Sequence, residues 1–157
     1  MSRVLPNAVV GRAFKTLGIT NERLMADLPP MIELGLQKLY GFQHNDGSWG
    51  WWYDDSGDDY QTAYVLFGLV ATRDAGYAVD DGVIQRGAEW LQGRLEHMDR
   101  RAEAYALYVL AMAGETDALP QAQALADADL AGDEALDPFS RAALAIALHE
   151  AGDGERA

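Results

Sequence analysis

The sequence predicts an all-α fold of antiparallel helical hairpins, and two observations lead to this class. Apolar residues recur at three- and four-residue spacing through most of the 157-residue chain, which is the period of an amphipathic helix. Helices with one apolar face also alternate along the chain with helices that are apolar nearly all round. Because a helix that is apolar all round is buried all round, we expect an inner layer of apolar helices and an outer layer of amphipathic ones.

Turn residues divide the first half of the chain into helical segments. Gly18 ends the first segment, because glycine readily adopts the left-handed conformation that closes a helix. Pro29 and Pro30 follow a short segment and predict a firm break, after which a new helix begins. The expected amphipathic helices are residues 6–17 and 31–43, with the short segment 21–28 between them, and residues 60–75 form the first apolar helix.

The second half shows the same alternation. Asp80 or Asp81 is expected to cap an amphipathic helix that runs to about Leu95. Asp137 and Pro138 predict a further helix start, as N-cap and first helical residue. The other expected segments are residues 100–113, 120–128 and 138–150, of which the first and last are apolar nearly throughout.

The apolar helices repeat one another in sequence. Residues 63–69 resemble residues 104–110, which lie 41 positions later. Residues 104–115 in turn match residues 142–153 at an offset of 38. A period of about 40 residues is typical of stacked helical hairpins, in an open solenoid or a closed ring.

The two-layer pattern favours a ring over an open stack. In such a ring Tyr64, Leu107 and Ile146 are expected to be mostly buried, since they lie on apolar helices. The helices assigned to the inner layer are 60–75, 100–113 and 138–150.

Residues 41–53 hold a dense aromatic run. Four rings fall between Trp49 and Tyr53, interrupted only by Gly50. Each ring can bury about 150–250 Å², so we expect this loop to fold onto an apolar surface. Gly47 and Gly50 permit backbone angles that a side chain would forbid.

Within this run, Gln43, Gly47 and Trp49 resemble the QW motif of the α/α-toroid terpene cyclases. The resemblance implies that Gln43 ties down a neighbouring helix end while Trp49 packs beneath it, which is a stabilising role without chemistry. Three further rings exceed what one helix end needs, and they either join this packing, line a pocket or cover a partner surface. These rings are Trp51, Trp52 and Tyr53.

No motif in the chain predicts catalysis or metal binding. The acidic residues 54–59 match neither the EF-hand spacing nor the acid motif of class II terpene cyclases. We interpret them as a solvated turn in which Asp58 or Asp59 caps the next helix. None of the three histidines has a second ligand at metal-binding spacing, and there is no nucleophile elbow or phosphate loop. We therefore expect no catalytic residue, no metal and no cofactor.

Length and composition suit a single domain, residues 1–157, because 49% of the residues are hydrophobic. The formal net charge of −13 argues against nucleic acid or an anionic membrane surface as partner. No apolar run reaches transmembrane length and the N-terminus has no signal core, so we expect no membrane contact by this chain. The absence of cysteine excludes disulfides, thiolate metal sites and a cysteine-derived thioester within it.

Several runs together resemble the thioester domain of bacterial alpha-macroglobulins. The resemblance is strong from Met1 to about Leu95. From Arg100 onward only the general pattern of the residues is similar. The main runs are Met1-Ser2-Arg3-Val4-Leu5-Pro6-Asn7, Leu36-Gln37-Lys38-Leu39-Tyr40-Gly41-Phe42-Gln43, Asp46-Gly47-Ser48-Trp49-Gly50-Trp51-Trp52 and Thr62-Ala63-Tyr64-Val65-Leu66.

This resemblance implies an α/α toroid within a large secreted or periplasmic protease trap. In that family a protease cleaves a bait region, the thioester domain moves, and a Cys–Gln thioester acylates the attacker. Aromatic packing keeps water from the thioester until then. The residues of this chain that the resemblance assigns to a thioester pocket or structural aromatic loop are Gln43, Asp46, Gly47, Trp49, Trp51, Trp52, Tyr53, Tyr60 and Thr62.

The chain departs from the family in three ways. The family's Cys-x-Glu-Gln motif, which would lie just upstream of Met1, is absent from this sequence. The catalytic histidine of the complement relatives is not carried over to His97, which leads almost directly into the next helix. A full thioester domain has about six hairpins, and this chain has room for about half of them. We therefore expect a fragment of a thioester domain, part of a protease inhibitor, without the thioester residues.

That interpretation sets the expected partners. They are proteases, met through the full-length parent protein, and other domains of the parent. Self-association through a cut edge is also expected, with Leu144, Ile146 and Leu148 lining an uncovered flank of the last hairpin. Two alternatives remain. One is a terpene-cyclase-like or polysaccharide-acting toroid enzyme that uses Trp51, Trp52 and the loop 54–59, and the other is a helical-repeat interaction module.

Overall fold

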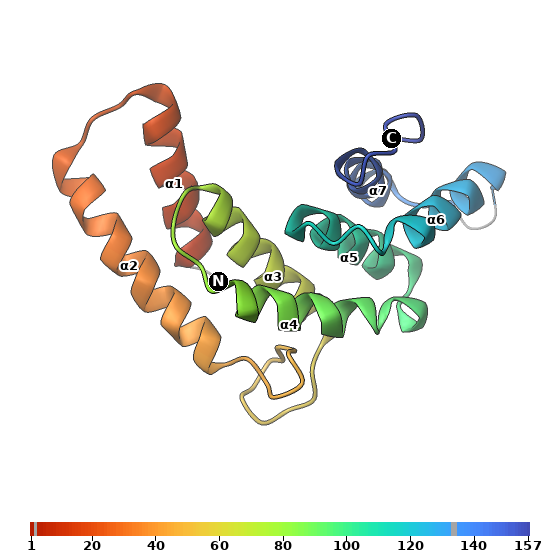
Figure 1. The fold of residues 1–157 in the computed structure, drawn as a ribbon, viewed down its shortest axis with the longest axis horizontal. Helices are drawn as coiled ribbons and strands as arrows, with labels where there is room; N and C mark the ends of the chain where they lie inside the picture. The colour runs from red at the N-terminus through yellow and green to blue at the C-terminus, as the bar shows by residue number, and fades with distance from the viewer. Residues whose placement is uncertain (2, 133–134) are drawn as a thin grey trace.

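The computed structural model describes residues 1, 3–132 and 135–157, and its regular structure there is entirely helical (Figure 1). The all-α class predicted from the sequence is confirmed. The α-helices are α1 (Val4–Leu17), α2 (Glu22–Gly41), α3 (Asp59–Asp74), α4 (Asp81–Gln92), α5 (Arg100–Ala113), α6 (Leu119–Ala131) and α7 (Pro138–Glu150), and a short 3-10 turn, η1 (Leu95–His97), follows α4.

The helices form two layers of an arc. Helices α1, α3, α5 and α7 follow one another along its inner side, and each packs on the next. Helices α2, α4 and α6 cover the outer side, where α4 packs on α3 and α5, and α6 on α5 and α7 (Figure 1). The predicted inner layer of three apolar helices is confirmed, and α1 joins it.

The core lies between the two layers, and α3 and α5 supply much of it. Leu66 and Leu69 of α3 and Leu110 of α5 are fully buried. Thr72, near the end of α3, is also fully buried, and its hydroxyl donates to the Gly68 carbonyl oxygen at 2.6 Å, so it leaves no unpaired donor. Because both flanks of these helices are covered by neighbours, residues on nearly every face must be apolar, as the sequence pattern indicated.

Aspartates begin four of the helices. The Asp58 carboxylate accepts from the Gln61 N–H at 2.8 Å, and Asp80 accepts from the Gly82 N–H at 2.8 Å, which settles both pairs of alternatives left by the sequence. Asp137 caps α7 as predicted, and Asp99 caps α5 in the same way. Each such cap satisfies N–H groups that a helix start leaves free.

The predicted break at Pro29 and Pro30 is wrong, because α2 runs through both residues. Each proline removes one helical hydrogen bond. Both prolines are exposed, so water can hydrate the carbonyls that lose their donors. Leu28 and Ile32, on either side of the prolines, are buried against the rest of the molecule. Their packing keeps α2 continuous although these hydrogen bonds are missing.

Two other boundaries differ from the prediction. The helix capped by Asp80 ends at Gln92, and Leu95 belongs to the separate turn η1, where it is fully buried. Helix α6 extends to Ala131, three residues beyond the predicted end at Ala128. Nowhere in the described part of the chain is a helix both long and apolar enough to cross a bilayer.

Helix α7 lies at one end of the arc and exposes one face. Leu144 and Leu148, predicted to line an open flank, are instead buried against the neighbouring helices. Ile146, predicted both to be buried in the inner layer and to line the uncovered flank, is 44% exposed, as the second prediction requires. It shares its exposed face with Phe139 and Ala142, at three- and four-residue spacing. Of the other two residues expected in the inner layer, Leu107 is buried and Tyr64 is half-buried.

We predict that the chain self-associates through this face of α7. Ile146→Glu should abolish the association, because it places a charge on the apolar face. The matched control is Leu130→Glu on α6, which changes another exposed aliphatic residue, outside that face. Light scattering across a salt series measures the effect, since salt screens the repulsion between chains of charge −13. A monomer at every salt and protein concentration would contradict the prediction.

Candidate functional site: the aromatic loop

Residues 42–58 connect α2 to α3 and are called the aromatic loop below. The loop lies at one end of the molecule, below α4 in the view of Figure 1. It joins the first hairpin to the second, so its contacts decide how α2 and α4 are held together in the outer layer. The contacts of Gln43 and Trp49 do most of this.

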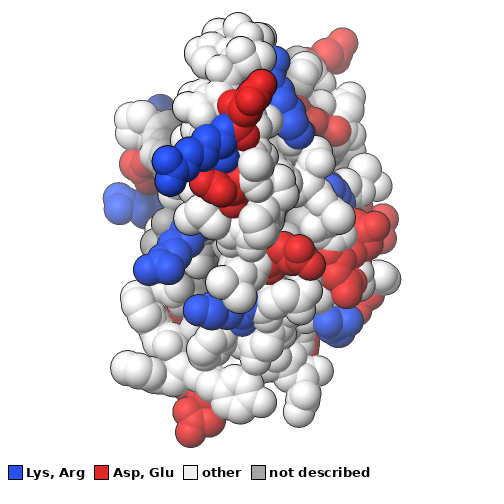
Figure 2. Space-filling model, turned by 90° about the vertical axis from the view of Figure 1, so that its left-hand side faces the viewer, with Lys and Arg blue, Asp and Glu red and all other residues white. Residues whose placement is uncertain are grey.

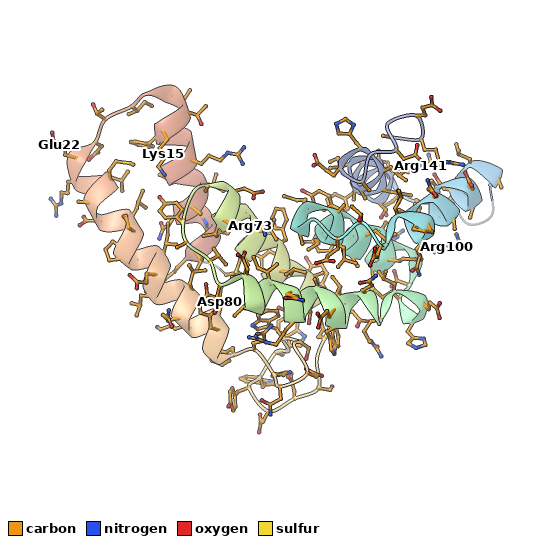
Figure 3. All side chains as sticks on the ribbon, viewed as in Figure 1. Lys15, Glu22, Arg73, Asp80, Arg100 and Arg141 are labelled. Atoms are coloured by element: carbon orange, nitrogen blue, oxygen red, sulfur yellow. The ribbon has the colours of Figure 1, made fainter. Side chains whose placement is uncertain are left out.

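Gln43 links the end of α2 to the start of α4. Its side-chain N–H groups donate to the carbonyl oxygens of Gly47 and Val83, both at 3.0 Å. Its side-chain oxygen accepts from the Arg86 guanidinium, with a shortest distance of 2.7 Å. The amide is therefore saturated on both sides, which fixes its orientation. Close by, the Asp80 N–H donates to the Tyr40 hydroxyl at 3.0 Å, where Figure 3 places Asp80 at the start of α4 facing α2.

Trp49 is the buried ring of the loop, with 2% of its surface exposed. Its indole N–H donates to the Leu39 carbonyl oxygen, in the last turn of α2, at 2.9 Å. Its backbone is paired with the Thr62 hydroxyl, which accepts from the Trp49 N–H at 3.0 Å and donates to its carbonyl oxygen at 3.1 Å. The ring lies against Gly87, where a side chain on α4 would overlap it. Trp49 thus joins α2, α3 and α4.

Gly47 allows the loop to approach α4 closely. Its φ of +96° lies in the left-handed region that side chains disfavour. A Cβ atom at this position would stand 2.3 Å from the Arg86 carbonyl oxygen, which belongs to the backbone of α4. Both the angle and the space therefore require glycine at residue 47.

The other three rings of the loop face solvent, which corrects the expectation that the whole run folds onto an apolar surface. Trp51 is 70% exposed and Trp52 is 74% exposed, and Tyr53 is similar. Tyr53 meets the exposed ring of Phe42 edge to face at 6.3 Å between centroids. After Gly50 the chain turns outward, because the Asp55 carboxylate accepts from the Trp51 and Trp52 N–H groups at 2.8 and 3.0 Å.

The acidic residues after this turn are engaged in separate structural contacts. Asp55 closes the turn, Asp58 caps α3, and Asp59 pairs with Arg94 at 3.1 Å. Asp55 also borders a cavity of about 450 Å³ together with Asp54 and Asp46, whereas Asp58 and Asp59 lie outside its lining. The acidic loop that the enzyme alternative named is thus divided between this cavity and the start of α3.

Asp46 organises the first turn of the loop. Its carboxylate accepts from the Ser48 hydroxyl at 2.7 Å and from the Ser48 N–H at 3.0 Å. The hydroxyl bond is the main cause that lowers the pKa of Asp46, and a hydrogen bond with Trp90 of α4 acts in the same direction. Asp46 therefore stays ionised across the physiological range.

Tyr60 belongs to a different group of rings. It stacks on Tyr64 at 6.3 Å and meets Tyr105 at 6.0 Å, and Tyr105 meets Phe139 at 6.3 Å. These rings border a cavity of about 590 Å³ at the N-terminal ends of α3, α5 and α7. Burial and the neighbouring hydroxyls raise the pKa of Tyr105. The structure thus separates Tyr60 from the loop residues with which the sequence grouped it.

Helix α4 and the turn after it contribute residues that the sequence analysis missed. Arg86 holds Gln43, Trp90 contacts Asp46, and Arg94 holds Asp59. Arg86 and Trp90 lie four residues apart on one face of α4, and Arg94 follows at the same spacing in the turn beyond Gln92. The regular spacing of one aromatic and two cationic residues could have predicted that this part of the chain contacts an acidic, aromatic loop.

Met1 lies beside the loop end of α2. Its side chain packs on Gly68 of α3, and burial lowers the pKa of the N-terminal amine. Met1, Leu39 and Phe42 border a cavity of about 330 Å³. The start of the chain and the aromatic loop therefore occupy the same end of the arc.

Figure 2 shows the face formed by α1 and α2, turned toward the viewer. Positive and negative side chains are mixed over this face, between wide areas of uncharged atoms. Toward its lower end, where the aromatic loop lies in Figure 1, uncharged atoms predominate, in keeping with the exposure of Phe42, Trp51 and Trp52.

Comparison with known proteins places the chain beside alpha-2-macroglobulins. A family model described as the A-macroglobulin TED domain matches residues 1–119. An alpha-2-macroglobulin of Thermotoga maritima is 42% identical over 114 residues, which are 73% of this chain and 6% of that protein. The chain therefore spans a small part of that relative.

Solved structures show the same fold. A crystal structure of a mutant Salmonella alpha-2-macroglobulin matches 98% of this chain and 11% of its own, with a TM-score of 0.77 and 24% identity. A crystal structure of trypsin-activated alpha-2-macroglobulin from Escherichia coli matches the same shares, with a TM-score of 0.74 and 23% identity. The two-layer arc is thus part of an α/α toroid, as the sequence indicated.

Proposed function

Since this chain belongs to the A-macroglobulin TED domain family, we propose that it is the helical core of a thioester-type domain in a bacterial protease inhibitor. The chain makes up about half of that domain and does not contain the thioester residues. Its role is to bury and position a reactive segment supplied by the parent protein, and it performs no catalysis of its own. The observation that carries the proposal is the family match over residues 1–119.

The position of Met1 supports this role. A segment that enters the domain just before Met1 would arrive beside Leu39 and Phe42, at the apolar cavity that these residues border. An internal thioester is an electrophile, so it must be kept from water until a protease is engaged. Apolar and aromatic surface at this end of the arc is suited to that purpose.

The remaining residues of the candidate site divide into two roles in this proposal. Gln43, Gly47, Trp49 and Thr62 hold the loop to α2, α3 and α4, and Asp46 fixes its first turn. Trp51, Trp52 and Tyr53 supply exposed aromatic surface for another domain of the parent, since exposed apolar patches are typical of interaction surfaces. Tyr60 packs with the rings of Tyr64 and Tyr105 and takes no part in the proposed thioester pocket.

The partners and the cellular location of this domain follow from those of its parent protein. We propose that it meets proteases in the periplasm or outside the cell, and that its bait region and thioester lie outside these 157 residues. The test is to incubate the parent protein with trypsin and to analyse the products by denaturing electrophoresis. A covalent trypsin complex that contains this domain is expected. Proteolysis without any trapped enzyme would contradict the proposal.

The isolated chain is predicted to form no covalent bond with amines. It has no cysteine, so it holds no thioester that an amine could open. Incubation with methylamine followed by intact-mass measurement should leave the mass unchanged. The parent protein treated in the same way is the control. A stoichiometric adduct on the chain itself would show a reactive group other than a thioester.

A further inference from the structure

His44 connects the two halves of the aromatic loop. It is the residue after Gln43, and only 11% of its side chain is exposed. Its Nδ1 atom lies 3.0 Å from the Ser48 hydroxyl oxygen, in the first turn of the loop. Its Nε2 atom lies 3.3 Å from the Trp52 carbonyl oxygen and 3.6 Å from Asp55 Oδ1, in the second turn.

The contact at Nδ1 requires a proton on that nitrogen. The Ser48 hydroxyl has one proton, and it is donated to the Asp46 carboxylate at 2.7 Å. The Asp46 carboxylate is ionised, so it can only accept. Ser48 therefore presents a lone pair to His44, and the hydrogen atom between them must belong to the imidazole.

The contacts at Nε2 require a second proton. The Trp52 carbonyl oxygen can only accept. Asp55 Oδ1 is a buried atom without a hydrogen-bond partner among the described residues, whereas Oδ2 of the same carboxylate accepts two backbone N–H groups. A neutral ring with its proton on Nδ1 would direct a lone pair at both oxygens, which is repulsive.

We propose that His44 is a proton-dependent latch of the aromatic loop. As an imidazolium it donates to Ser48 through Nδ1 and to the Trp52–Asp55 turn through Nε2, which joins the two turns. When the Nε2 proton is lost to solvent, the ring keeps its bond to Ser48 and releases the second turn. The inference rests on the contacts of the loop alone and goes beyond the proposed function.

The charges around His44 favour this arrangement. Asp46 and Asp55 face it from its own loop, and Asp54 lies beside it along the wall of the same shallow cavity. From α4, Arg86 is held by the Gln43 oxygen, and Trp90 contacts Asp46. The carboxylates of Asp46 and Asp55 are thus the charged groups nearest the ring, and both offer oxygen atoms that can only accept when ionised.

The latch acts on the exposed rings of the loop. Asp55 holds the N–H groups of Trp51 and Trp52, and its second oxygen faces His44. Release of that oxygen and of the Trp52 carbonyl removes the connection between this turn and the buried part of the loop. The direction in which Trp51 and Trp52 are presented is then expected to depend on pH, while Trp49 remains in place.

The test is nuclear magnetic resonance of the 157-residue chain from about pH 5 to pH 8, the interval in which histidines commonly titrate. At the acid end, both ring N–H groups of His44 should be observed, because hydrogen bonds protect them from exchange with water. As His44 loses a proton, the amide signals of Trp51 and Trp52 should shift with the same midpoint. The Trp49 amide signal should not follow.

Two variants separate the latch from a purely structural role. His44→Gln should remove the pH-dependent shift of Trp51 and Trp52, while the control His97→Gln, at an exposed histidine on η1, should leave it unchanged. A single ring proton on His44 throughout the folded range would overturn the proposal. Amide signals of Trp51 and Trp52 that do not shift with His44 would also overturn it. Both outcomes can be measured on the unmodified chain, even if a variant fails to fold.

Discussion

Replacing Trp49 by alanine is expected to destabilise the chain by about 3–5 kcal/mol, the range for large aromatic truncations in protein cores. The substitution removes a ring that is 2% exposed and leaves the Leu39 carbonyl without its indole donor. It also empties the space between the loop and Gly87, which the nearby backbone cannot easily close. Denaturant unfolding measures the difference in free energy.

Trp52→Ala is the matched control, because it truncates the same side chain in the same loop. Trp52 is 74% exposed, so its loss should change the free energy of unfolding by about 0.5 kcal/mol or less. Equal and small losses for the two variants would show that Trp49 does not hold the loop to the helices.

Gly47→Ala is expected to have the second-largest effect, a loss of about 2–5 kcal/mol. A left-handed backbone costs an L residue about 1–2 kcal/mol, and overpacking adds about 1–3 kcal/mol. The added Cβ would stand 2.3 Å from the Arg86 carbonyl oxygen, and backbone of α4 cannot rotate away as a side chain could.

Gly114→Ala provides a control with the same backbone angle. Both glycines have a φ of +96°, but nothing lies within 4 Å of a Cβ at residue 114. This variant should therefore show only the conformational part, about 1–2 kcal/mol. If the two variants lose the same free energy in denaturant unfolding, the contact between the loop and α4 is looser than described.

Helix starts and layers could be predicted from the sequence because both depend on local patterns. An aspartate directly before an apolar run, as at Asp137, predicts an N-cap from the local sequence, without knowledge of the neighbouring helices. The apolar character of α3 indicated burial for the same reason. The continuity of α2 through Pro29 and Pro30 could not be predicted, because tertiary packing of Leu28 and Ile32 outweighs a local preference.

Exposure in the candidate site depends on neighbours that the sequence does not specify. Trp49 and Trp51 are two positions apart in the same aromatic run, yet one is buried and the other is open to solvent. The difference arises from Asp55, which turns the chain outward through contacts that follow no periodic pattern. Ile146 is exposed for a related reason, since an apolar helix is covered only where a neighbour packs on it.

The series of inner helices has a consequence for how the chain opens and refolds. Because each inner helix packs mainly on the helices next to it along the arc, the folding free energy is approximately a sum of nearest-neighbour terms. Gln43 adds a term in the outer layer, because it bonds across that layer to Val83, 40 positions away. Together with Trp49 it makes the first two hairpins one cooperative unit, whereas α6 and α7 can open as a separate unit without disturbing it.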